Sequence, residues 1–399
     1  MSSASLGFPP VRALTSTAQR RLDRFVRPTV RIGGRARSAF TVSGYVGLAL
    51  SIPLAMALAV ARGLEPAVMA AIILAGLATF LTLSMATKIV CGEERQTYYH
   101  HEIAVMAVTT LLVWALGRPV VPYLDVTILG IGAFLACVRV GCLMVGCCHG
   151  RPHRWGVRYR PEHAAAGFSP HLLRARLFPV QALESLWVAV VVAIGATMIL
   201  TDQPAGSALA WYVVAYDAGR FCFELLRGDA VRPYFRGFSE AQWISIGLTL
   251  LVVGLEVSGV LPASSWHGAV AVGMIVLMTW LAARRRADPM RAAIVHPRHV
   301  REVASALDLL GSVGKLPVSN PRVSVIDVAV TSLGVRISAG DVADGSGRVA
   351  HFALSEESGM TPVTATIVAD LVALLRGETG QRELVERNGV YHLLVHRPA

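Results

Sequence analysis

The sequence has few charged residues. Asp, Glu, Lys and Arg make up 16% of the 399 residues, whereas apolar residues make up 54%. Soluble domains carry about 25% charged residues. Each ionised group placed in hydrocarbon costs several kcal/mol, so a bilayer selects against charge. The deficit therefore indicates an integral membrane protein.

Acidic residues are scarcer than basic ones, and the formal net charge is +11. In a chain this apolar, we expect the counterpart of the positive charge to be anionic membrane lipid and not nucleic acid. The six cysteines lie mostly in apolar runs, which argues against a secreted disulfide framework. They are Cys91, Cys137, Cys142, Cys147, Cys148 and Cys222.

The N-terminal segment lacks the short apolar core and small-residue cleavage site of a signal peptide. Residues 1–38 hold eight arginines and one acid, Asp23. We expect them to form a basic, disordered tail at a membrane face.

Long apolar runs are abundant. A bilayer-spanning helix needs about 20 apolar residues. Eight segments qualify by their apolar content, although the third is short: 41–61, 67–87, 102–117, 120–145, 180–200, 206–226, 242–258 and 266–283. The sequence predicts an all-α polytopic membrane unit over residues 39–286, with about 7–8 transmembrane helices.

The composition changes after Arg284, Arg285 and Arg286, and residues 287–399 are typical of a small soluble α/β module. Helical spacing predicts helices at 297–311 and 361–376, the second with Thr361 as its cap and Gly377 as its stop. Alternating or β-branched segments predict strands at 322–328, 331–338, 348–354 and 389–396. The pattern indicates no function for this module.

The segment from Arg139 to Gly150 interrupts an apolar run. Gly141, Gly146 and Gly150 permit close backbone approach, and Pro152 cannot continue a helix. The pattern predicts a helix that breaks into a loop at membrane depth, which is tolerated where the loop lines a cavity or packs on protein.

Three interpretations of this segment compete. Arg139 and freed backbone N–H groups could hold a phosphate. Cys142, Cys147, Cys148 and His149 could hold a metal, but zinc ligands usually come in two separated pairs, which disfavours this reading. The cysteines could instead be small apolar fillers, with the arginine extending to the interface.

A second charged group lies in the sixth apolar segment. Asp217, Arg220, Glu224 and Arg227 are three or four residues apart and share one helix face. One interpretation is a self-satisfied ladder in which Arg220 pairs with Glu224 and Asp217. The other makes Arg220 a second phosphate ligand that Glu224 orients.

Tyr98, Tyr99, His100, His101 and Glu102 open the third apolar segment. Tyrosines at this depth are common interfacial anchors. His100 is a candidate proton acceptor, and an interfacial histidine in contact with headgroups is an equal alternative.

Four segments, 139–150, 178–184, 216–229 and 239–246, together resemble the prolipoprotein diacylglyceryl transferases. The family's signature at the end of a membrane helix matches Arg139, Gly141, Gly146 and Gly150. Its later elements match Pro179, Gln181, Glu184, Arg220, Phe221, Glu224, Arg227, Ser239 and Gln242. Order and spacing agree over about residues 40–258.

The sequence also departs from the family. Cys142 stands where the family has a signature asparagine, and Cys147 where it has an acid. The family's histidine falls on His100, but His101 and Glu102 replace the glycines that follow it. Tyr45 corresponds weakly to a tyrosine of the family's first helix. The pattern is that of a divergent, cysteine-rich member with an additional C-terminal module.

The resemblance implies transfer of a diacylglyceryl group from phosphatidylglycerol to the lipobox cysteine of a prolipoprotein, in the bacterial inner membrane. It implies catalytic roles for Arg139, Arg220, Glu224 and His100. Substrate-binding roles fall on Gly141, Cys142, Gly146, Gly150, Gln181, Glu184, Arg227, Gln242 and Tyr45. The expected partners are phosphatidylglycerol, prolipoprotein signal peptides and membrane lipid, with no cofactor, metal or nucleic acid.

Two other functions stay open: a non-catalytic or repurposed phospholipid-binding membrane protein, and a thiol redox or metal-binding membrane protein. The orientation is also open. Loop arginines place the loop after Gly150 inside the cell, whereas the family resemblance, with about seven spans, places it outside.

Overall fold

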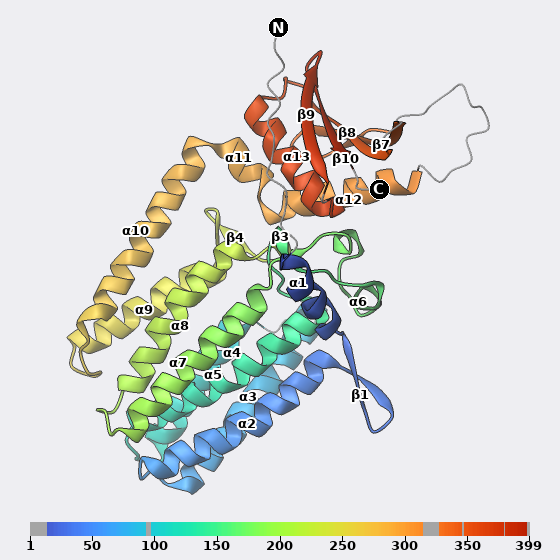
Figure 1. Ribbon diagram of the computed structural model, residues 1–399. Helices are drawn as coiled ribbons and strands as arrows, with labels where there is room; N and C mark the ends of the chain where they lie inside the picture. Colours follow the sequence, from blue (N-terminus) through green and yellow to red (C-terminus); the bar gives the residue numbers. More distant parts are fainter. Residues whose placement is uncertain (1–13, 93–96, 314–326, 345–346, 379, 397–399) are drawn as a thin grey trace.

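The computed structural model describes residues 14–92, 97–313, 327–344, 347–378 and 380–396. Within them, all eight predicted apolar segments form helices (Figure 1). These are α2 (Ala39–Ala61), α3 (Pro66–Cys91), α4 (Tyr98–Ala115), α5 (Val120–Val145), α7 (Val180–Leu200), α8 (Ser207–Leu226), α9 (Glu240–Val257) and α10 (Ser265–Ala287).

Six of these helices are long and apolar enough to cross a membrane: α2, α3, α5, α7, α9 and α10. The other two carry the polar groups singled out in the sequence. Helix α8 contains Asp217, Arg220 and Glu224, and α4 begins with the polar run from Tyr98 to Glu102. The predicted multi-pass membrane architecture is confirmed.

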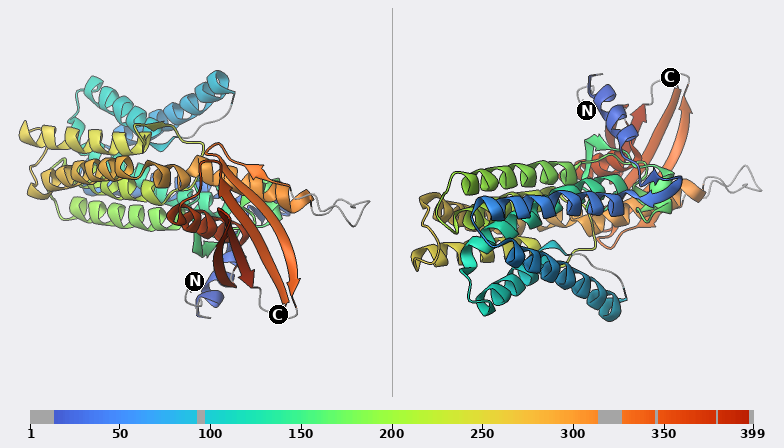
Figure 2. Two further views of the ribbon diagram at one scale, coloured as in Figure 1. Left: turned by 90° about the horizontal axis from the view of Figure 1, so that it is seen from above. Right: turned by 90° about the horizontal axis from the view of Figure 1, so that it is seen from below.

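Helix α5 is the centre of the bundle, because it packs against α2, α4, α7 and α8. Glycines permit the close approach: a Cβ on Gly132 would lie 2.4 Å from the Tyr212 ring of α8. Figure 2 shows α3 and α4 set off to one side of the other helices. Arg139 and Cys142, near the end of α5, are buried in this packing.

The C-terminal module has helices α11 (Pro289–Ile294), α12 (Pro297–Val313) and α13 (Pro362–Arg376) and an antiparallel sheet of order β6-β7-β8-β10-β9. Its strands are β6 (Ala329–Val330), β7 (Val335–Asp344), β8 (Gly347–Glu356), β9 (Gln381–Arg387) and β10 (Val390–His396). Thr361 caps α13 and Gly377 ends it with a φ of 66°, as predicted. Strand β9 was not predicted, and most of the predicted strand 322–328 lies outside the described residues.

The disorder predicted for the N-terminal tail is wrong for residues 14–38. They form helix α1 (Leu14–Phe25) and a hairpin of β1 (Thr29–Ile32) and β2 (Arg35–Ser38). Val26 is buried, and the Asp23 carboxylate accepts from the Arg176 guanidinium at 2.9 Å. These tertiary contacts compensate for a composition that does not fold by itself. Residues 1–13 lie outside the described part.

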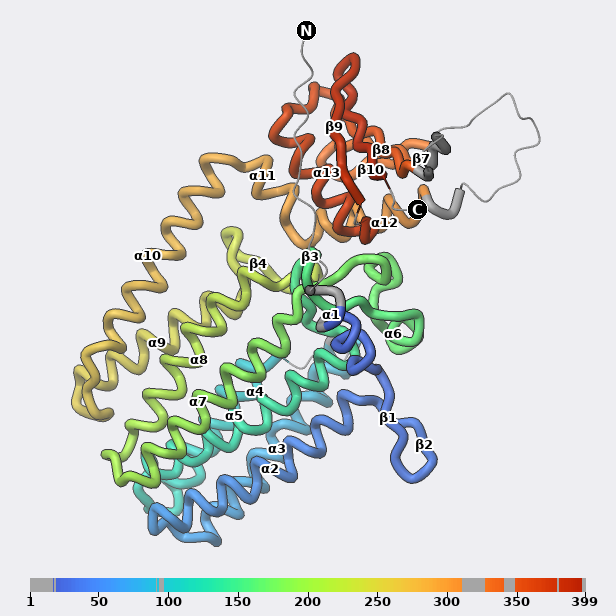
Figure 3. Tube along the Cα trace, viewed as in Figure 1, coloured from blue at the N-terminus to red at the C-terminus, as the bar shows by residue number. Residues whose placement is uncertain are grey.

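The connection between α5 and α7 and the C-terminal module share one hydrophobic core. This connection holds β3 (Pro152–Val157), α6 (Pro161–Ala165) and the short 3-10 helix η1 (Pro170–Leu172). Its Tyr159, Phe168 and Leu177 cluster with Val26 and with Phe352 of the module. Figure 3 shows the module, α1 and this connection gathered at one end of the bundle. The core therefore holds in place the loop that follows Arg139.

Candidate functional site

Helix α5 ends in the loop that its glycines predict. Gly146 has a φ of 85° and its N–H bonds the Cys142 carbonyl at 2.9 Å. Gly150 then lies beside two other segments: its N–H bonds the Phe178 carbonyl at 3.1 Å, and it bridges to Arg227. A Cβ on Gly150 would lie 2.3 Å from the Phe178 carbonyl oxygen, so only glycine fits there.

Glu184 of α7 joins the two arginines that the sequence assigned to phosphate. Its carboxylate lies 3.0 Å from the Arg139 guanidinium and 3.5 Å from that of Arg220, with the Tyr216 hydroxyl at 3.4 Å. All of these side chains are at least nine-tenths buried. Helices α5, α7 and α8 thus bring Arg139 and Arg220 to one carboxylate.

The carboxylate of Glu224 in α8 contacts three guanidinium groups. It lies 2.6 Å from Arg220 and 3.5 Å from Arg227, and it also pairs with Arg232. Asp229 in turn receives two hydrogen bonds from Arg227, each 3.0 Å long. We call these seven residues the arginine cluster: Arg139, Glu184, Arg220, Glu224, Arg227, Asp229 and Arg232.

The arginine cluster carries more positive than negative charge. Within the described residues it has four guanidinium groups and three carboxylates, and the Arg151 Nε donates to the Arg227 carbonyl next to it. The buried Nε atoms of Arg139 and Arg220 have no hydrogen-bond partner among those residues. A buried surplus of donors and positive charge is suited to an anion.

Outside the membrane spans, burial shifts the pKa values of one member of this cluster, Arg232, and of a nearby histidine, His296. Burial lowers the pKa of Arg232 to about 10. It also lowers the pKa of His296, which lies in the connection between α11 and α12, and nearby arginines lower it further. Of these arginines, Arg232 belongs to the arginine cluster, whereas Arg298, Arg151 and Arg285 lie outside it.

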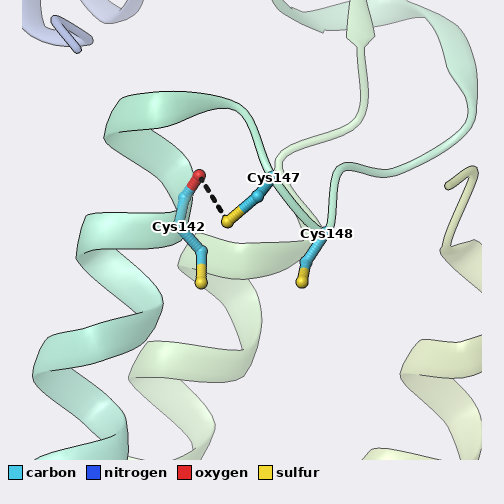
Figure 4. A group of neighbouring side chains, drawn as sticks. All are labelled: Cys142, Cys147 and Cys148. Carbon is cyan, nitrogen blue, oxygen red and sulfur yellow. Dashed lines mark hydrogen bonds between the residues drawn. The ribbon is translucent and has the colours of Figure 1, made fainter. Parts of the chain in front are cut away.

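The cysteines of the signature lie against the same arginines. Cys142 is buried on the last turn of α5, with its Sγ 4.0 Å from Nη1 of Arg139. Cys147 and Cys148 follow the turn at Gly146, and the three sulfur atoms lie within 4.8 Å of one another (Figure 4). The Gln181 side chain holds this turn by donating to the Cys147 carbonyl at 2.8 Å.

Several predicted site residues lie elsewhere by their described contacts. His100 of α4 is half-exposed and pairs with Glu240 of α9 at 2.7 Å. Tyr45 of α2 is 68% exposed. Gln242 forms a capping box with Ser239 at the start of α9 and donates to the Phe221 carbonyl. Two glycines act in packing: Gly141 faces Phe40 and Ser43 of α2, and Gly146 faces Phe168 and Tyr159.

Asp217 does not join the predicted ion-pair ladder. Its carboxylate accepts from the Tyr99 hydroxyl at 2.6 Å and from Thr249 at 3.4 Å, and the Tyr99 hydroxyl also meets Ser245 at 2.7 Å. Tyr98 and Tyr212 share a hydrogen bond of 2.8 Å, and Tyr212 stacks on Tyr216. We call this group the tyrosine cluster: Tyr98, Tyr99, Tyr212, Tyr216, Asp217 and Ser245. Tyr99 is buried, so it is not an interfacial anchor.

Arg232 and Asp229 are the site residues that the sequence did not assign to the site. They lie in the loop after α8, five and two residues beyond Arg227. A polar loop residue after a helix carries no periodic signal. The roles of Asp229 and Arg232 become visible only in the structure, where this loop folds back over Glu224.

A model of the prolipoprotein diacylglyceryl transferase family matches residues 99–257. The phosphatidylglycerol–prolipoprotein diacylglyceryl transferase of Clostridium tetani is 28% identical over 119 residues, which make up 30% of this chain and 45% of that protein. The chain thus matches about half the length of this curated relative. The resemblance seen in the sequence is confirmed over residues 99–257, a range that includes every residue of the arginine cluster.

Proposed function

We propose that this protein transfers a diacylglyceryl group from phosphatidylglycerol to the lipobox cysteine of a prolipoprotein. The observation that carries this proposal is the arginine cluster, a buried surplus of positive charge inside the range that matches the family. We assign the activity to the membrane unit, residues 39–286, and no catalytic role to residues 287–399, which share a hydrophobic core with the connection between α5 and α7.

The chemistry fits the charges of the site. The acceptor sulfur attacks a glyceryl carbon, the carbon–oxygen bond breaks, and glycerol phosphate leaves with the electron pair. Negative charge develops on the phosphate, and fixed donors aimed at such charge are a major source of catalysis. We propose that Arg139 and Arg220 hold the phosphate through their unpaired Nε donors. Glu184 and Glu224 are positioning residues, because each contacts two or more arginines.

The substrates follow from the same reaction. We propose that phosphatidylglycerol and the membrane-inserted signal peptide of a prolipoprotein both reach the site from the lipid phase of the bacterial inner membrane. Arg227 would border the headgroup. His100 remains our sequence-based prediction for the thiol base, although its described partner is Glu240.

A second candidate function rests on two of the departures from the family pattern, Cys142 and Cys147. Cys142 and Cys147 replace polar residues of the signature, and Cys142 is buried against Arg139. A site that keeps its arginines but loses polar contacts to the substrate would bind phospholipid headgroups without transfer.

Complementation separates the two functions. The full chain is expressed in a bacterial strain depleted of its own diacylglyceryl transferase, and the lipidation of a reporter prolipoprotein is measured. We expect the wild type to restore lipidation, Arg139→Ala and Arg220→Ala to abolish it, and Arg286→Ala, at an exposed position of α10, to retain it. A wild-type chain that is stably produced and never restores lipidation contradicts the transferase proposal.

A further inference from the structure

Three thiols converge where the sequence shows only one side of a metal site. The turn at Gly146, with a φ of 85°, and the left-handed conformation of Cys148, with a φ of 53°, fold the chain back towards the last turn of α5. In Figure 4 the side chains of Cys142 and Cys148 point in the same direction, and the side chain of Cys147 lies between them. Their mutual separation of at most 4.8 Å allows one ion to reach all three.

The donor set selects a soft ion. Thiolates favour zinc, copper(I) and iron–sulfur clusters over magnesium or calcium. Zinc binds sulfur at about 2.3 Å, which places tetrahedral ligands about 3.8 Å apart. Since the sulfurs lie within 4.8 Å of one another, closing to this spacing needs a change of at most about 1 Å in any sulfur–sulfur distance. Three protein ligands with an open fourth position are typical of catalytic zinc, whereas structural zinc has four.

The surrounding charge supports thiolates at this position. Three thiolates and one Zn²⁺ carry a net charge of −1. The arginine cluster has a positive surplus among the described residues, and the Arg139 Nη1 lies 4.0 Å from the Cys142 sulfur. Guanidinium groups beside a cysteine stabilise the thiolate, the form that binds metal.

The proposed reaction also requires a group that ionises the acceptor thiol. Thiolate, not thiol, is the effective nucleophile. The described contacts of His100 are at Glu240, near the surface, and the carboxylates of the arginine cluster are already held by guanidinium groups. A thiol that coordinates zinc loses its proton outright.

We propose that Cys142, Cys147 and Cys148 bind one zinc ion whose open position takes the acceptor thiol. The part of this inference that concerns the acceptor rests on the proposed transferase function, and in it zinc replaces His100 as the group that ionises the acceptor thiol. As the acceptor sulfur binds zinc, its proton passes to solvent. The bound sulfur then attacks the glyceryl carbon, the carbon–sulfur bond forms, the carbon–oxygen bond breaks, and glycerol phosphate leaves with the electron pair against Arg139 and Arg220.

Metal content tests the site without any activity. We expect the full chain, purified in detergent, to hold about one zinc ion and to show sulfur-to-metal absorption when Co²⁺ replaces it. Cys142→Ser and Cys148→Ser should lose both signals, and Cys222→Ser, an exposed cysteine of α8 outside the site, should keep both. Cys148→His keeps a zinc ligand and should retain metal, which separates lost ligation from lost folding. Equal metal in the wild type and Cys148→Ser, or binding of Cu⁺ alone, overturns the zinc site.

The open position is tested with a lipobox peptide. We expect the peptide to shift the Co²⁺ spectrum of the wild type, and a peptide with serine in place of the lipobox cysteine to leave it unchanged. A spectrum unchanged by both peptides overturns the acceptor role and leaves a structural metal. Zinc binding without complementation contradicts only the transferase function, whereas full complementation by Cys148→Ser contradicts only the catalytic zinc.

Discussion

Helix α8 contributes to two buried polar clusters. The two clusters satisfy their buried carboxylates in different ways. At Asp217 the tyrosine cluster surrounds a carboxylate with hydroxyl groups. One turn further on, Arg220 and Glu224 belong to the arginine cluster, where ionic contacts predominate. Tyr216 touches both, because it stacks on Tyr212 and its hydroxyl faces Glu184. The change in chemistry falls within a single helix.

The difference indicates that the tyrosine cluster serves packing and the arginine cluster serves binding. Hydroxyl donors satisfy Asp217 without adding charge, which suits the interior of a bilayer protein. Buried ion pairs are weak evidence for stability, because desolvation can exceed the attraction. Seven buried or half-buried ionic groups with a surplus of positive charge are therefore better explained by a bound anion than by folding. The comparison predicts that the two clusters respond differently to substitution.

Glu184→Gln should have the largest effect on stability. The substitution leaves Arg139 without its described carboxylate and Arg220 with Glu224 alone. Breaking a buried ion pair typically costs about 3–5 kcal/mol. Equilibrium unfolding in mixed detergent measures this loss. The control is Glu65→Gln in the exposed pair of Glu65 with Arg118, which should cost under about 1 kcal/mol. Equal losses in both variants would show that the buried position of Glu184 is unimportant.

Arg220→Lys should reduce transfer by about 100-fold or more, the typical loss when one donor to a developing anion is removed. A lysine keeps the charge but lacks the planar fork that contacts Glu184 and Glu224 together. The readout is the initial rate of label transfer from phosphatidylglycerol to a lipobox peptide. Asp217→Asn, one turn away in the tyrosine cluster, is the matched comparison and should change this rate far less. A reversed order would place the active site at Asp217.

The sequence predicts the framework of the membrane unit well, because bilayer spans leave long apolar runs. It also brings Arg139, Arg220 and Glu224 into one site through their residue types and spacing. It assigns Glu184 to the substrate, but it does not reveal that the Glu184 carboxylate contacts both Arg139 and Arg220. Such a bridge depends on the packing of α5, α7 and α8, which no local pattern records.

Other differences have the same cause. Residues 14–38 are too basic to fold alone, and they fold because Val26 and Asp23 meet the connection after α5. The convergence of Cys142 with Cys147 and Cys148 depends on the turn at Gly146. Both features depend on the tertiary structure, because a local sequence pattern does not record contacts between segments that are distant in sequence.

Tyr99→Phe should destabilise the protein by about 1–3 kcal/mol, because Asp217 loses a buried hydrogen-bond donor. The same change should leave the transfer rate within a few-fold of the wild type, since Tyr99 contacts Asp217 and Ser245 and not the arginines. Unfolding and transfer are measured on one preparation. A large loss of transfer with unchanged stability would mean that the tyrosine cluster takes part in the reaction.

Acidification should have the smallest effect, and it tests whether burial and the surrounding arginines keep the His296 ring neutral. Burial and Arg298, Arg151, Arg285 and Arg232 lower the pKa of His296 below its usual 6.5. The unfolded chain then takes up the proton first, so stability falls as pH drops below about 6.5 and stops falling below the folded pKa. The Arg298 N–H donates to Nδ1 of His296 at 3.3 Å, which also favours the neutral ring. Melting temperatures between about pH 7.5 and 5 should show this slope in the wild type and in His153→Gln, an exposed control. They should show a shallower slope in His296→Gln, and identical slopes in all three proteins would show that His296 does not cause the loss of stability.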